Sequence, residues 1–132
     1  MRRSPTRVRI GVAINLVIAA LHLLDLRTLL GPEFRDVVGS YFSDLTLPFA
    51  FYFLLCFVDD QVAALRPALA KAVVVFAAST GAELLQGVGI HALGRTFDPL
   101  DIVIYGTGVA CALLLDRLVL TRFVRNWPLA RT

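Results

Sequence analysis

Four long apolar stretches constrain the fold of this chain more than any other feature of its sequence. Each approaches the roughly 20 residues that a helix needs to cross about 30 Å of hydrocarbon. They run over about 8–26, 41–58, 68–89 and 100–120. None alternates polar and apolar residues as a strand of a membrane β-barrel does. We therefore predict an all-α integral membrane bundle of four transmembrane helices, forming one domain over residues 1–132.

Composition excludes the main soluble classes. Hydrophobic residues make up 58% of the chain and charged residues 17%, whereas soluble domains carry about a quarter charged residues. Such hydrophobicity excludes a disordered chain, and two cysteines are too few for a disulfide scaffold. The net charge of +3 does not indicate nucleic-acid binding, because the basic residues lie at the chain ends and beside apolar stretches rather than on one polar face.

The distribution of Lys and Arg predicts the orientation. With four spans, both termini and the second connection share one side, which carries ten of the 13 basic residues; Arg27, Arg35 and Arg95 lie on the other. The excess of positive charge in cytoplasmic segments then places both termini in the cytoplasm of a multi-pass protein of the cell membrane. We expect the first span to be retained, since its apolar residues continue beyond the length of a signal peptide.

Proline and glycine mark the connections. Gly31 and Pro32 follow the first span, and we expect a short interfacial helix over about 32–42. This places Pro48 in the first turns of the second span, where its missing N–H costs least. Lys71 is expected to extend towards the cytoplasmic interface.

Glu83 is the most informative polar residue. It follows Lys71 by twelve residues, which is about 18 Å along a helix and therefore inside the hydrocarbon region. An ionisable residue at that depth is costly and points to function.

Other polar residues are expected to gather around Glu83. Residues three or four apart share a helix face, and a short turn between the third and fourth spans would bring two such faces together at the extracytoplasmic side. The predicted binding site consists of Glu83, Gln86, Arg95, Asp98, Asp101, Asp44 and Tyr105.

Several alternatives remain open for this cluster. It could be a polar clamp that fixes the pairing of two helices, since buried polar residues often set association without chemistry. Asp98 and Asp101 could cap the fourth helix. The carboxylates are of the type that Mg²⁺ or Ca²⁺ prefers, but they form no ligand motif and Arg95 would compete for them. We expect no metal and no cofactor.

The remaining candidates are interpreted as structural. His22 is expected to form a hydrogen bond within the bundle, and Cys56 and Cys111 to act as small apolar fillers. Gly106 and Gly108 suit close contact with a partner helix, for which small residues around Gly81 would supply the matching surface.

The polar cluster resembles the VanZ-like family of small bacterial membrane proteins. The resemblance rests on Glu83-x-x-Gln86, then Arg95, then Asp98-x-x-Asp101, followed by a helix with Gly106 and Gly108, and covers about residues 79–112. The resemblance implies a multi-helix membrane fold whose polar residues gather at one membrane face. The namesake is associated with resistance to teicoplanin.

Three functions follow as hypotheses. In the first, the extracytoplasmic site binds the head group of a lipid or lipid-linked cell-envelope precursor, with Arg95 pairing an anionic group. In the second, Glu83 is the general acid or base of an enzyme acting on a lipid-linked substrate, with Asp101 as its ionised partner. In the third, the protein is a structural subunit, alone or in an oligomer.

Overall fold

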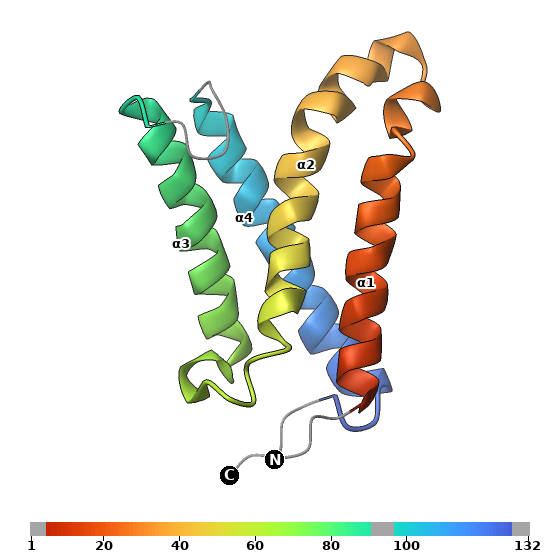
Figure 1. Cartoon of the computed structure of the whole chain (residues 1–132), viewed down its shortest axis with the longest axis vertical. Coiled ribbons are helices and arrows are strands. Elements are labelled where there is room, and N and C mark those ends of the chain that lie inside the picture. Colours follow the sequence, from red (N-terminus) through yellow and green to blue (C-terminus); the bar gives the residue numbers. More distant parts are fainter. Residues whose placement is uncertain (1–4, 91–96, 128–132) are drawn as a thin grey trace.

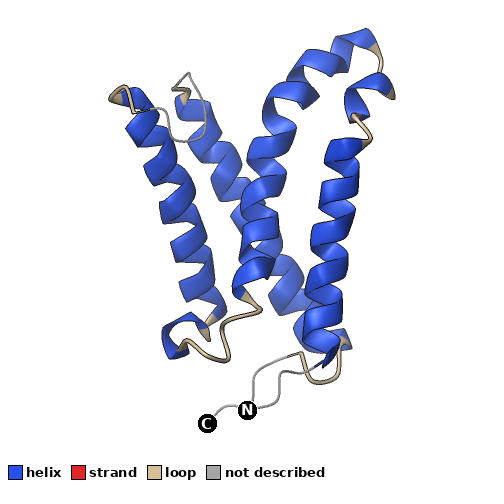
Figure 2. Cartoon of the chain, in the orientation of Figure 1, coloured by secondary structure: helices blue, strands red, loops and turns tan. Residues whose placement is uncertain are grey.

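The computed structural model describes residues 5–90 and 97–127, and every regular element among them is helical. Its long helices are α1 (Pro5–Leu23), α2 (Pro32–Leu55), α3 (Ala68–Gly87) and α4 (Pro99–Leu114), the last continued by the π-helical turn η3 (Leu115–Leu120) and α5 (Thr121–Phe123). Two short 3-10 turns, η1 (Leu26–Thr28) and η2 (Ala63–Leu65), lie in the connections (Figure 2). Four helices, with α4 counted through to Phe123, are long and apolar enough to cross a membrane. The predicted all-α fold with four such helices is confirmed.

The helices form a bundle in which α2 and α4 cross at the centre. α1 packs beside α2, and α3 packs beside α4 (Figure 1). The start of α1 and the end of α5 lie at the same end of the bundle, which we call the termini end. The opposite end, where α1 connects to α2, is the distal end.

Proline positions explain where the helices begin. Pro32 and Pro99 occupy the first turn of α2 and α4, and Pro67 directly precedes α3. The fixed φ of proline suits a helix start, where its missing N–H leaves no bond unmade.

The second helix differs from its predicted form. The expected interfacial helix over 32–42 is continuous with the span, so that α2 has 24 residues and Pro48 is buried in its interior. Because Pro48 has no N–H, it cannot bond to the carbonyl of Asp44, and such a residue bends a helix. The distal part of α2 leans accordingly in Figure 1.

The hydrophobic core lies towards the termini end. Tyr52 and Phe53 of α2 pack there with Val75 of α3, Ala112 of α4 and Trp127, and all are almost completely buried. The distal half contributes few buried side chains, so close packing is concentrated where the chain ends meet.

Close contact between α2 and α4 depends on Gly108. A Cβ atom there would overlap the carbonyl oxygen of Leu45, whereas one at Gly81 would meet nothing within 4 Å. The prediction that Gly108 faces a partner helix is therefore confirmed, but that helix is α2 and not α3. Gly106 does face α3, where it lies against Phe76.

Candidate functional site

Glu83 lies at the centre of the distal polar cluster. Its side chain is buried, with 2% of the residue exposed. The backbone N–H of Asp98 donates to Oε1 at 2.8 Å, and the Tyr105 hydroxyl donates to Oε2 at 3.1 Å. Both carboxyl oxygens therefore accept hydrogen bonds from the start and the second turn of α4, which fixes α3 against α4.

Asp98 serves as the N-cap of α4. Its Oδ1 accepts a hydrogen bond from the backbone N–H of Leu100 at 2.9 Å. This satisfies one of the free donors at the helix start, so the capping alternative is correct for Asp98. The side chain and the backbone N–H of Asp98 therefore both form hydrogen bonds within the protein.

Asp44 and Asp101 form the open part of the cluster. Their side chains interact across the α2–α4 contact, and both residues are only half-buried. Each carboxyl group carries two oxygen atoms that can accept hydrogen bonds. The pair can therefore accept hydrogen bonds from the hydroxyl or ammonium group of a ligand.

The face of α4 explains how these residues meet. Asp101, Tyr105 and Gly108 are spaced by four and three residues, so they lie along one face of the helix. Gly108 brings that face against α2, where Leu45 is the direct neighbour of Asp44 in the chain. The close approach at Gly108 thus positions the pairing of Asp44 with Asp101.

Five of the seven predicted site residues are brought together: Glu83 with Asp98 and Tyr105, and Asp44 with Asp101. Gln86 is half-buried on the next turn of α3 and already has an interaction within the protein. Arg95 lies outside the described residues. Within 5–90 and 97–127, no group of three carboxylate, histidine or cysteine side chains is placed to bind a metal ion.

A second polar cluster lies at the termini end, and sequence reasoning missed it. Oδ2 of Asp59 forms ion pairs with Arg7 at 2.6 Å and with Lys71 at 2.8 Å. All three side chains are buried, and Lys71 is only 3% exposed, so its predicted extension to an interface is wrong. Oδ1 of Asp59 is buried without a hydrogen-bond partner among the described residues.

Asp116 is the second centre of this cluster. Trp127 Nε1 donates to its Oδ1 at 2.6 Å, and the Tyr52 hydroxyl donates to its Oδ2. The residue lies in the π-helical turn η3, where the Thr121 hydroxyl donates to its backbone carbonyl at 2.7 Å. A π turn rotates the residues that follow relative to a regular helix, and here the side chain is buried between α2 and the segment carrying Trp127.

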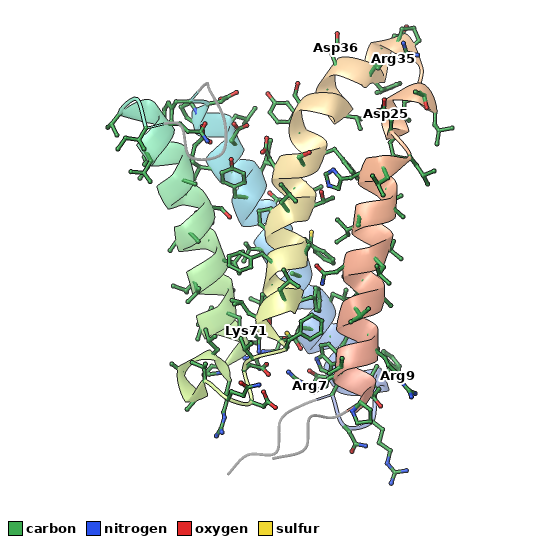
Figure 3. All side chains as sticks on the ribbon, viewed as in Figure 1. Arg7, Arg9, Asp25, Arg35, Asp36 and Lys71 are labelled. Atoms are coloured by element: carbon green, nitrogen blue, oxygen red, sulfur yellow. The ribbon has the colours of Figure 1, made fainter. Side chains whose placement is uncertain are left out.

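The two centres are joined into one closed network. The Arg7 guanidinium donates to the Trp127 carbonyl and lies 5.0 Å from its ring centre, while the Lys71 ammonium lies 5.7 Å from the Tyr52 ring. Figure 3 shows Arg7 and Lys71 at the termini end, with Asp25 and Arg35 at the distal end. All four spans and the segment after α5 are thereby connected.

His22 forms the internal hydrogen bond that the sequence predicted. Its Nε2 lies 2.9 Å from the hydroxyl of Thr46 on α2, and its ring packs 4.9 Å from that of Phe42. Cys56 is buried, whereas Cys111 is exposed on the surface of α4 and does not fill the core as predicted.

Comparison of the chain with known proteins gives no match. No protein-family model, no curated protein and no solved structure matches it. The resemblance to the VanZ-like family therefore remains a prediction that rests on the residues of the distal cluster.

Proposed function

We propose that this chain is a multi-pass protein of the cell membrane with both termini in the cytoplasm, and that its distal cluster binds a polar head group on the extracytoplasmic side. The ligand class is a lipid or a lipid-linked precursor of the cell envelope. Membership of the VanZ-like family is part of this proposal, because the residues that carry the resemblance are those of the cluster.

The half-exposed pair of Asp44 and Asp101 supports this proposal most strongly. Two half-buried carboxyl groups that interact between neighbouring helices offer lone pairs to hydroxyl or ammonium donors of a ligand. The side chains of Glu83, Asp98 and Tyr105 form hydrogen bonds within the protein. We therefore assign them to positioning α4, and Asp101 with Asp44 to ligand contact.

The enzymatic alternative is less well supported. A general acid or base has to reach the proton that it transfers. Glu83 is 2% exposed and accepts hydrogen bonds from two donors of its own chain. A purely structural role is the stronger second candidate, because the pairing of Glu83 is what a clamp between α3 and α4 requires.

Binding measurements on the purified protein test the proposal. The wild type is titrated with a panel of envelope lipids and lipid-linked precursors, and Asp101→Asn and Arg95→Ala are compared with it. We expect at least one lipid to bind, and to bind more weakly to both variants. Wild-type affinity for none of the panel contradicts the proposal.

A further inference from the structure

A large apolar groove lies on the side of α2 that faces α1. It has a volume of about 710 Å³, within the range of ligand-binding cavities. Its walls come from the membrane-spanning helices α1, α2 and α3. The lining residues include His22 of α1, Leu54 of α2 and Ala78 of α3.

A smaller polar pocket adjoins the distal end of this groove. It has a volume of about 330 Å³ between the end of α1 and the distal part of α2, and it is lined by His22, Asp25 and Ser43 among others. His22 lines both cavities. The apolar groove and the polar pocket therefore share one lining side chain.

The hydrogen bonds of His22 fix what its ring can offer. The Thr46 hydroxyl donates to the Phe42 carbonyl at 2.7 Å, so its proton is used, and it accepts from His22 Nε2. In a neutral imidazole, Nδ1 is then the acceptor. Together with the Asp25 carboxylate, it favours a ligand that donates hydrogen bonds.

The charge of the pocket selects further among lipids. Asp25 is the charged side chain among the described residues that line it, and none of these is Lys or Arg. A head group with net negative charge would be repelled by this carboxylate. A hydroxyl or ammonium group is complementary to the same residues.

We propose that the two cavities form one binding site for a membrane lipid, with a hydrocarbon chain in the groove and a head group without net negative charge in the pocket. The site is separate from the Asp44–Asp101 pair, which lies between α2 and α4. It does not depend on the function proposed for that pair. If the four helices cross the membrane, lipids of the surrounding bilayer can place a hydrocarbon chain in the groove.

Native mass spectrometry of the full chain tests this site with two lipids of identical chains, dioleoyl phosphatidylethanolamine and dioleoyl phosphatidylglycerol. We expect the ethanolamine lipid to bind about tenfold more tightly, the equivalent of one charge-assisted hydrogen bond. Equal binding of the two lipids by the wild type overturns the proposal.

Matched variants locate the site. Ala78→Phe fills the groove from an exposed position on α3, and Ala77→Phe adds the same side chain at an exposed neighbour that does not line it. We expect only Ala78→Phe to weaken binding of the ethanolamine lipid, and equal effects of the two variants overturn the assignment.

The Asp25→Asn variant tests the polar pocket. Asp25 has a φ of 45°, which Asn tolerates, so this variant should fold and lose the discrimination between the two lipids. Retained discrimination counts against the pocket.

Discussion

Arg7 of α1 and Asp59, which follows α2, form an ion pair of 2.6 Å that is buried at the termini end of the bundle. Lys71 of α3 pairs with the same carboxyl oxygen. One carboxylate therefore joins three of the four spans, and the network continues through Trp127 to the end of α4. This arrangement secures the termini end of the bundle, whereas the polar pocket lined by Asp25 lies at the opposite end.

Loss of Arg7 should destabilise the protein strongly. Removing one partner of a buried ion pair leaves an uncompensated charge and costs about 3–5 kcal/mol; we expect Arg7→Ala to fall at the lower end, since Lys71 remains. Arg9→Ala is the matched control, because Arg9 is exposed two residues further along (Figure 3). Thermal unfolding in detergent measures both, and equal midpoints would show that the pair is not a stabilising contact.

The two donors to Asp116 should act together. Tyr52→Phe and Trp127→Phe each remove one hydrogen bond to its carboxyl group and should cost about 1–3 kcal/mol. Because they share one acceptor, the double variant should depart from the sum of the single variants. A double-mutant cycle of unfolding free energies checks this, and strict additivity would argue against a coupled network.

Gly108→Ala should separate α2 from α4. The added Cβ overlaps the Leu45 carbonyl oxygen, a backbone atom that cannot rotate away. Gly81→Ala is the control on α3, where the methyl group meets open space and alanine should stabilise the helix by up to about 1 kcal/mol. The expected outcome is a lower unfolding midpoint for Gly108→Ala and an unchanged or higher one for Gly81→Ala; the reverse order would contradict the helix packing described above.

The proposed orientation, with both termini in the cytoplasm, predicts which residues react with a membrane-impermeant maleimide in intact cells. In a background with Cys56→Ala and Cys111→Ala, Asp36→Cys at the distal end should be labelled from outside. Arg125→Cys, which follows α5, should be labelled only after permeabilisation. Labelling of Arg125→Cys in intact cells would place the termini outside and the distal cluster in the cytoplasm.

The four long apolar helices were predictable because crossing a hydrocarbon core requires a certain length and an apolar composition. The boundaries differ most for α2, whose continuity from Pro32 through Pro48 depends on packing against α4. Glu83 is buried within the bundle, and its predicted depth in the hydrocarbon region stays a prediction. Helix periodicity placed Tyr105 one turn from Asp101 on the fourth span, and its hydroxyl reaches Glu83, whereas the hydrogen bond from the Asp98 backbone was not predicted.

The termini-end network was not predictable in the same way. Arg7 and Lys71 carry the charge that orients a membrane protein, so the sequence gives no separate sign that they are buried. Asp59 lies after a helix end, and Asp116 depends on a π turn that no periodicity indicates. One signal was present: Asp59, Asp60 and Asp116 are the acidic residues on an otherwise basic side, and such residues beside apolar spans need cationic or hydrogen-bonding partners.

The affinity of Asp101→Asn for an envelope lipid that the wild type binds, measured together with its unfolding midpoint, tests the central claim most directly. Glu83→Gln is measured alongside as the positioning variant. If the Asp44–Asp101 pair contacts the ligand, Asp101→Asn should lose about tenfold in affinity with little change in midpoint, and Glu83→Gln should mainly lower the midpoint. Unchanged affinity in Asp101→Asn, with a lowered midpoint in both variants, would contradict the account and identify the cluster as a structural clamp.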